Sequence, residues 1–197
     1  MSALRSDPLT DKTHVGVVGH SEGGFVAPVL ASRVPDLAFV IVLAAPLATM
    51  PDQVVHEVAS GLNCAGVPAE GIAKAKALRV ALQDAVLQNR NWESLQREIE
   101  AAEGEKWFRG ARVSREWKTP SQAMIDRTGR YLDFNPAGYW KLVKAPVLAM
   151  YGETDTQVQA HESRMMLQQA LPAAKDHQRT IYIYPTANHI FLEAETG

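Results

Sequence analysis

The chain has 197 residues, of which 46% are apolar, and a formal net charge of -2 at pH 7. This length and composition suffice for one domain with a buried core and leave room for an insertion within it. The near-neutral charge, without any run of like charges, excludes the basic surface typical of proteins that bind nucleic acid or anionic membranes. We therefore expect a small, roughly neutral molecule as the binding partner.

The same residues argue against a membrane segment. The longest apolar run covers residues 37–45, far short of the roughly 20 residues that span a bilayer. The single cysteine, Cys64, cannot form an internal disulfide, and residues 1–11 contain no apolar stretch typical of a secretion signal. The sequence therefore predicts a cytoplasmic protein.

Four short segments are predicted to be strands of one parallel sheet. Three are rich in β-branched residues, are bounded by turn formers and lack in/out alternation, namely His14–Val18, Ala38–Leu43 and Val147–Tyr151. The fourth, Thr180–Tyr184, alternates Ile and Tyr, which favours an edge strand with one wetter face. Helical patterns at Glu22–Arg33 and His161–Leu171 lie between strands, and this alternation predicts parallel pairing.

Residues 47–144 interrupt this pattern with helical spacing. Pro51 marks a helix start, and apolar residues recur at helical intervals between positions 72 and 86 and between 92 and 99. The stretch from Trp107 to Trp140 shows no clean period. We expect a core made of residues 1–46 and 145–197, and an all-helical insertion that serves as a cap or lid over the site. Extra packing without substrate contact is the alternative for the insertion.

The most informative stretch is Gly19-His20-Ser21-Glu22-Gly23-Gly24, between the first predicted strand and the first long helix. A Gly-x-Ser-x-Gly sequence in this position predicts a sharp turn that exposes a nucleophilic serine above the strand ends. Gly19 and Gly23 are expected to leave room where strand, turn and helix crowd together. The N–H of Glu22, at the helix N-terminus, is expected to stabilise an oxyanion. The alternative is a glycine-rich turn in which Ser21 only caps a helix.

A serine nucleophile needs a base, and the base needs a third group that orients it. Asp155 follows the third predicted strand, at the edge where catalytic groups of parallel sheets gather. It is preferred over Glu153 because it lies further past the strand, although either carboxylate could be a solvated turn residue or a helix cap. His189 follows the fourth strand, which completes the order Ser, Asp, His. The other histidines are expected to be surface or packing residues, with the His20 side chain pointing away from the serine; they are His14, His20, His56, His161 and His177.

These motifs resemble bacterial α/β-hydrolase carboxylesterases, relatives of dienelactone hydrolases and prolyl-oligopeptidase-like enzymes. The resemblance rests on the Gly19–Gly24 turn, called the elbow below, on the loop Gly152–Val158 and on the pair Asn188–His189. It covers nearly the whole chain. It implies an α/β fold in which Ser21 is the nucleophile, Asp155 the acid and His189 the base. The implied reaction is hydrolysis of a carboxylic ester through an acyl-serine, with no metal or organic cofactor. The alternatives are a thioesterase or peptidase of the same fold, and a weak or inactive remnant that serves in binding or assembly.

The chain also departs from that family, whose members have further strands before the elbow strand and a helix after the histidine. The resemblance therefore implies a truncated half-sheet of about four parallel strands, with the elbow strand left as an apolar edge. A loop in the missing part would supply the second oxyanion N–H, and loss of one such donor lowers kcat roughly 10²–10³-fold. Because an exposed apolar edge is unstable alone, we expect a homodimer that forms edge to edge or through the sheet faces.

Overall fold

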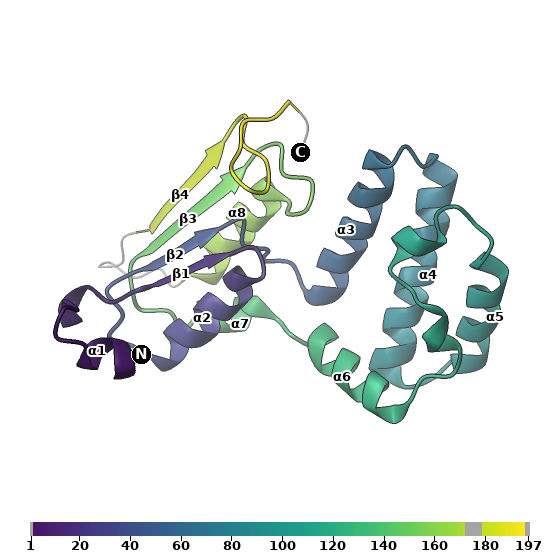
Figure 1. The fold of residues 1–197 in the computed structure, drawn as a ribbon, viewed down its shortest axis with the longest axis horizontal. Helices are drawn as coiled ribbons and strands as arrows, with labels where there is room; N and C mark the ends of the chain where they lie inside the picture. Colours follow the sequence, from purple (N-terminus) through teal and green to yellow (C-terminus); the bar gives the residue numbers. More distant parts are fainter. Residues whose placement is uncertain (1, 172–178, 196–197) are drawn as a thin grey trace. The chain divides into compact units, whose positions relative to one another are not determined.

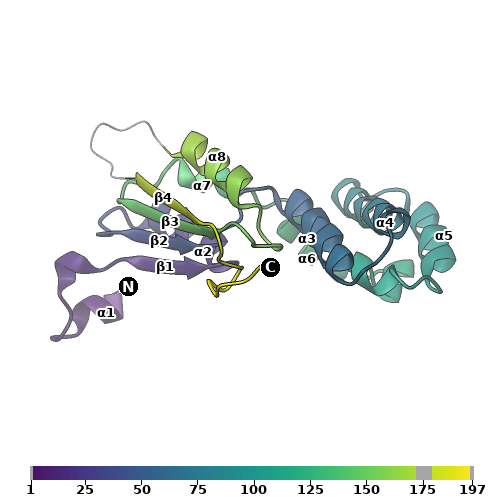
Figure 2. The same cartoon turned by 90° about the horizontal axis from the view of Figure 1, so that it is seen from above.

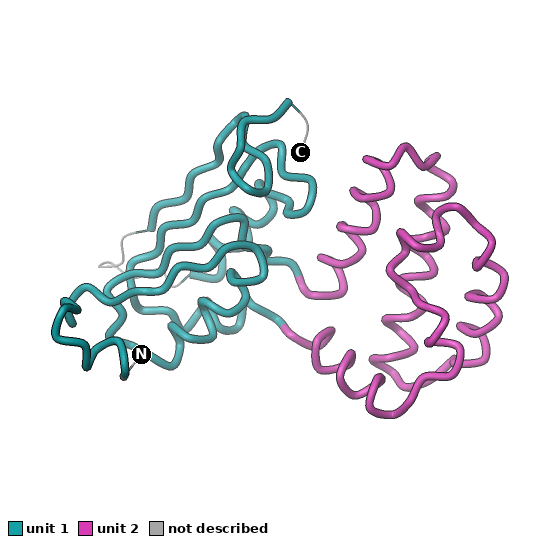
Figure 3. The backbone as a smooth tube through the Cα atoms, viewed as in Figure 1, with its two compact units in different colours: residues 1–48, 135–197 teal, residues 49–134 magenta. Residues whose placement is uncertain are grey.

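The computed structural model describes residues 2–171 and 179–195, and its contacts divide the chain into two compact units (Figure 3). Unit 1 comprises Met1–Ala48 and Asn135–Gly197, and unit 2 comprises Thr49–Phe134. The sequence predicts an insertion that extends to residue 144, whereas residues 135–144 belong to unit 1. The reason is that helix α7 (Pro136–Trp140) packs against two other helices of unit 1.

Unit 1 contains a four-stranded parallel sheet in the order β1-β2-β3-β4 (Figure 1). The strands are β1 (Val17–His20), β2 (Val40–Leu43), β3 (Val147–Gly152) and β4 (Arg179–Tyr184). Its other helices are α1 (Ser2–Ser6), the 3-10 helix η1 (Lys12–His14), α2 (Gly23–Arg33) and α8 (Ala160–Ala170). The prediction of an α/β fold with four parallel strands is therefore confirmed.

The start of the first strand differs from its prediction. His14 belongs to the 3-10 helix η1 rather than to the strand. This helix begins after Asp11, whose side chain accepts a hydrogen bond from the Thr13 N–H (2.9 Å) and caps its N-terminus. The sheet begins at Val17, whose N–H donates to the Phe39 carbonyl (3.1 Å), and the strand continues to His20. The observed strand thus begins and ends later than the predicted one, and its last residue, His20, directly precedes Ser21.

Helices α2, α7 and α8 cover one face of the sheet (Figure 2). Val42 and Ala149 point into this layer and are fully buried, as is Trp140 of α7. The alternate strand positions point to the opposite face, where Val18 of β1 is 61% exposed and Tyr182 of β4 is 54% exposed. Within the described residues of unit 1, the sheet is thus apolar on both faces, and the helices of that unit cover only one of them.

Unit 2 is built from helices throughout its length. They are α3 (Met50–Cys64), α4 (Ala69–Gln88), α5 (Trp92–Ala102), the 3-10 helices η2 (Phe108–Ala111) and η3 (Arg115–Lys118), and α6 (Gln122–Leu132). Leu82, Leu95 and Ile99 are almost fully buried in a core separate from that of unit 1. Trp117 stacks on Trp92 with ring centroids 6.4 Å apart. The segment after α5 lacks a helical period because it forms short 3-10 turns that fold back onto this core.

None of the helices in the described part of the chain combines the length and the apolarity that a membrane span requires.

The packing of unit 2 generates a stability prediction on helix α4. Leu82→Ala should lower the free energy of unfolding by about 2–5 kcal/mol, because Leu82 is fully buried and its truncation leaves a cavity. Leu87→Ala is the matched control, since Leu87 lies on the same helix and is 45% exposed; its effect should stay within about 0.5 kcal/mol. Urea denaturation followed by circular dichroism and tryptophan fluorescence measures both. Equal losses in the two variants would contradict the assigned core.

Candidate active site

Ser21 lies in a strained turn between β1 and α2. Its φ angle is 53°, in the left-handed region that residues with a side chain rarely adopt. The turn is held by hydrogen bonds from the Ser21 N–H to the Leu43 carbonyl (2.8 Å) and from the Gly24 N–H to the Ser21 carbonyl (2.8 Å). Backbone strain of this kind costs on the order of 1–3 kcal/mol and persists only where the surroundings impose it. The result is a serine presented at the carboxyl end of the sheet.

The glycines around Ser21 have different roles. A Cβ atom on Gly19 would overlap the backbone carbonyl of Gly23, so this position requires glycine for space, as the sequence indicates. The expectation for Gly23 is wrong, because a Cβ there would meet nothing within 4 Å. The crowded position on the helix side is Gly24, whose added Cβ would overlap the side chain and backbone of Ala45. The paired glycines of the motif were the only sequence signal for Gly24, and they do not say which of the two is crowded.

Ser21, His189 and Asp155 form one hydrogen-bonded series, on loops that follow β1, β4 and β3 (Figure 1). His189 Nδ1 lies 2.8 Å from Asp155 Oδ2, and His189 Nε2 lies 2.9 Å from Ser21 Oγ. Because an ionised carboxylate only accepts hydrogen bonds, Nδ1 carries the imidazole proton and donates it to Asp155. Nε2 is then free to accept from the Ser21 hydroxyl, which is the arrangement that general-base activation needs.

The carboxylate of Asp155 is itself fixed. Its side chain is only 1% exposed, and its Oδ1 accepts hydrogen bonds from the N–H groups of Gln157 (2.8 Å) and Val158 (2.9 Å). These bonds leave Oδ2 for the imidazole. Glu153, the competing acid, contacts His161 instead, with 3.0 Å between Oε1 and Nε2. The geometry therefore distinguishes two carboxylates that sequence separates only by their position in the loop.

Gly152 was not singled out by the sequence but sets the position of the His189 loop. A Cβ on Gly152 would overlap the backbone carbonyl of Ala187. That same carbonyl accepts a hydrogen bond from the Thr154 N–H (3.2 Å). The loop that carries the acid and the loop that carries the histidine thus pack backbone against backbone. The signal available in sequence was a glycine directly after a predicted strand, which is too common to be specific.

The remaining histidines differ in their relation to this site. His20 contacts the His189 loop: its Nε2 lies 2.8 Å from the His189 carbonyl oxygen, and the two rings are 5.0 Å apart. The expectation that His20 is a surface or packing residue rather than the base is therefore confirmed, since His20 is exposed and contacts this loop instead of Ser21. His14 and His56 make their contacts with neighbouring residues on their own segments. His177 lies outside the described residues.

Glu22 stands at the N-terminus of α2, directly after the serine. The hydrogen bonds recorded for this turn use the N–H groups of Ser21, Gly24 and Phe25, and among the described residues none uses the N–H of Glu22. This donor lies at the positive end of the helix dipole. The Glu22 N–H can therefore donate a hydrogen bond to, and stabilise, negative charge that develops on a group bound at Ser21.

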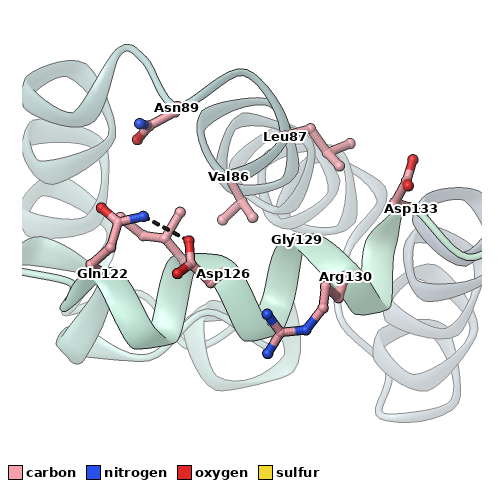
Figure 4. A pocket seen from close by; sticks show the side chains of 9 residues that line it. Val86, Leu87, Asn89, Gln122, Asp126, Gly129, Arg130 and Asp133 are labelled. Atoms are coloured by element: carbon pink, nitrogen blue, oxygen red, sulfur yellow. Dashed lines mark hydrogen bonds between the residues drawn. The ribbon is translucent and has the colours of Figure 1, made fainter.

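A separate pocket of about 450 Å³ lies within unit 2, between the end of α4 and helix α6 (Figure 4). Gln122 donates to Asp126 (2.7 Å) along its wall. The described residues that line it include no serine, cysteine or histidine; they are Val86, Leu87, Asn89, Gln122, Ile125, Asp126, Gly129, Arg130 and Asp133. This pocket thus lacks the groups needed for nucleophilic chemistry, which are gathered in unit 1.

Comparison with solved structures finds the same fold. The acylaminoacyl peptidase of Pyrococcus horikoshii superposes with a TM-score of 0.50 at 16% identity, over 95% of this chain and 22% of that one. The esterase domain of a Rhodothermus marinus protein matches with a TM-score of 0.47 at 15% identity, over 96% of this chain and 58% of that one. Acetyl xylan esterase 1 of a Thermoanaerobacterium species gives 0.45 at 16% identity, over 95% and 44%. The chain thus spans less than two thirds of each. At 16% identity, the match to the Pyrococcus horikoshii peptidase indicates the fold alone.

A search of curated protein sequences finds no match. The model of the alpha/beta hydrolase family, however, matches residues 2–195, which is nearly the whole chain. The elbow with its left-handed serine and the parallel order of the strands agree with that match. The chain belongs to the α/β-hydrolase family.

Proposed function

We propose that this chain is a serine hydrolase that cleaves carboxylic esters through an acyl-Ser21 intermediate. The observation that carries the proposal is the continuous hydrogen-bond series from Asp155 through His189 to Ser21. A serine hydroxyl is a weak nucleophile until an adjacent base takes its proton, and His189 Nε2 is within reach to do so. Membership of a hydrolase family and the strained turn at Ser21 support the same reaction.

The proposed reaction has two halves. As Ser21 Oγ attacks the ester carbonyl carbon, its proton passes to His189 Nε2, and the imidazolium is stabilised by the Asp155 carboxylate. The tetrahedral intermediate then collapses, the bond to the alcohol oxygen breaks, and His189 returns the proton to the leaving alcohol. Water, deprotonated by the same imidazole, attacks the acyl-Ser21 carbonyl. Collapse of this second intermediate releases the carboxylic acid, and the proton returns to Ser21 Oγ.

The oxyanion of each tetrahedral intermediate is proposed to accept a hydrogen bond from the N–H of Glu22, which makes no hydrogen bond within the described turn. This assigns one donor where such sites use two. Activated esters with good leaving groups are therefore the first substrates to test. Thioesters and short peptide amides are the alternative substrates, and the predicted role of unit 2 as a lid stays a prediction.

The first test is covalent labelling with a fluorophosphonate probe. The wild-type protein should be labelled at Ser21, and Ser21→Ala should lose the label and at least about 10³-fold in kcat with p-nitrophenyl acetate. Ser32→Ala is the matched control, because Ser32 lies on α2 and its hydroxyl only donates to the Val29 carbonyl (2.8 Å). Its labelling and kcat should match the wild type.

Two further variants separate the roles in the series. His189→Ala should lose as much kcat as Ser21→Ala. Asp155→Asn should lose about 10⁴-fold, because the amide NH₂ donates to Nδ1 and leaves the imidazole proton on Nε2, which then cannot accept the Ser21 proton. A folded wild-type protein that the probe does not label would refute the hydrolase proposal and leave the binding or assembly role. Rates with p-nitrophenyl acetate, butyrate and octanoate, compared with a p-nitroanilide, then define the acyl preference.

The glycines of the elbow generate a further prediction. Gly19→Ala should abolish most labelling and hydrolysis, since the new Cβ overlaps the Gly23 carbonyl and the turn must shift. Gly23→Ala is the control, because its Cβ meets nothing and alanine favours the helix that begins there by about 0.5–1 kcal/mol. Gly23→Ala should keep kcat within about twofold and unfold at an equal or higher temperature. Similar activity in both variants would be evidence against the assigned turn.

We also propose that two copies of the chain associate through the sheet face that no described helix of unit 1 covers. Val18, Tyr182 and Tyr184 on this face are 61%, 54% and 43% exposed. The intervening strands β2 and β3 add the partly exposed Ile41, Leu43, Leu148 and Met150. Parallel sheets are almost always covered on both faces, and a two-fold contact would bury this apolar surface in both copies at once.

Light scattering coupled to size-exclusion chromatography tests this association. The wild-type protein should have twice the mass of one chain at micromolar concentration, and Val18→Lys should be monomeric because it places a charge in the contact. Val26→Lys on α2 is the control, since Val26 is equally exposed, at 60%, but lies on the helical side. A monomeric wild type would rule out the dimer without affecting the catalytic proposal.

A further inference from the structure

We propose that His20 is a positioning residue that holds the backbone of the His189 loop against β1, so that the His189 imidazole reaches Ser21. This inference rests on the proposed function, because it names a residue that serves the same reaction. His20 itself is not a base for Ser21, since its Nε2 lies 2.8 Å from the His189 carbonyl oxygen rather than from the serine.

The contact has a defined direction. A carbonyl oxygen only accepts, so His20 Nε2 carries a proton and donates it to His189 O. The two imidazole rings are also 5.0 Å apart and inclined by 48°, which places the His20 ring beside the His189 ring. His20 therefore meets His189 at both its backbone and its side chain, across 169 positions of sequence.

The His189 loop is held on its β3 side by the contacts of Ala187 with Gly152 and Thr154, but it needs a separate hold at its β1 end. Asn188 organises it: its Oδ1 accepts from the N–H groups of Ile190 and Leu192, each at 3.1 Å. The side chains of Ile190 and Leu192 are 60% and 59% exposed, so they bury little apolar surface that would anchor the loop. The loop starts at β4, at the far edge of the sheet from β1. It must therefore cross the strand ends to reach Ser21.

At the β1 end, two hydrogen bonds link this loop to the elbow in the described part of the chain: His189 Nε2 to Ser21 Oγ, and His20 Nε2 to His189 O. The first must break and re-form during each proposed catalytic cycle, because the serine oxygen becomes acylated. The second involves no reacting atom and can persist throughout. His20 thus supplies the lasting link between the strand that carries the nucleophile and the loop that carries the base.

His20 occupies this place because of strand alternation. In β1, Gly19 points into the covered face and is buried, whereas Val18 and His20 point to the opposite face. The His189 loop passes over that side of the β1 end (Figure 2). A side chain at position 20 meets the loop only if its donor atom extends far enough from the strand, and the Nε2 of histidine does so.

Side-chain replacements that keep or remove this donor test the inference. His20→Gln places an amide N–H near the position of Nε2 and should restore function, whereas His20→Leu keeps the bulk without a donor. His20→Asn carries its amide too short to reach and should resemble His20→Leu. With p-nitrophenyl acetate, we expect His20→Leu to lose about 10–100-fold in kcat with KM within about twofold, because a shift of the base affects the chemical step. His20→Gln should stay within about threefold of the wild type in kcat.

A spectroscopic readout reports the position of His189 without any turnover. The proton shared by His189 Nδ1 and Asp155 should give a low-field proton NMR signal that disappears in Asp155→Asn. In His20→Leu and His20→Asn this signal should shift or broaden, and in His20→Gln it should match the wild type. Circular dichroism and the melting temperature identify any variant that does not fold. Only those of the three His20 variants that fold are compared with the wild type.

The outcomes separate this inference from the proposed function. If the wild type is active and folded His20→Leu retains its kcat and its low-field signal, His20 does not position His189 and the inference is overturned. If folded His20→Gln is as impaired as His20→Leu, the donor is not the cause and the inference is likewise overturned. If the wild type neither hydrolyses esters nor reacts with the probe, the proposed function fails. The low-field signal in the His20 variants still decides the positioning role in that case.

Discussion

Parallel hydrogen bonding between β1, β2, β3 and β4 is the constraint on which the candidate site depends. In a parallel sheet every strand ends at the same edge, so loops far apart in sequence meet there. The loops after β1, β3 and β4 carry Ser21, Asp155 and His189 to that edge. The register that pairs Val17 with Val40, and Val40 with Val147, also decides which side chains face the helices and which face away.

Backbone crowding at this edge is handled by glycines. Gly19 and Gly24 let β1, the turn and β2 approach one another closely, and Gly152 lets the acid loop touch the histidine loop. The left-handed conformation of Ser21 is a local cost, and the hydrogen bond from its N–H to Leu43 helps to hold it. Ser21 is therefore placed by the backbone of two neighbouring strands rather than by side-chain packing.

The two units have independent cores and different relations to this chemistry. Unit 1 combines buried strand residues with α2, α7 and α8, whereas unit 2 packs its own helices around Leu82, Leu95 and Ile99. The serine, carboxylate and imidazole all lie in unit 1. Unit 2 is inserted between β2 and β3 in the chain and packs around its own core.

The amino-acid sequence by itself determined the α/β class, the four strands and the turn at Ser21. It did so because short β-branched runs, helical spacing and a Gly-x-Ser-x-Gly turn are local patterns. The positions of Asp155 and His189 after predicted strands also indicated them as the candidate acid and base. The boundary of the insertion at residue 134, rather than 144, was not readable, since α7 belongs to unit 1 through long-range packing.

Only the tertiary structure decided which groups meet. It paired Asp155 with His189 and Glu153 with His161, made Gly24 rather than Gly23 the crowded glycine, and brought His20 to the His189 carbonyl. Each of these depends on where another part of the backbone passes, to within an ångström or so, and the contact of His20 with His189 spans 169 positions of the chain. Local patterns specify elements and their order, but contact between segments more than a hundred residues apart is set by strand register and loop path.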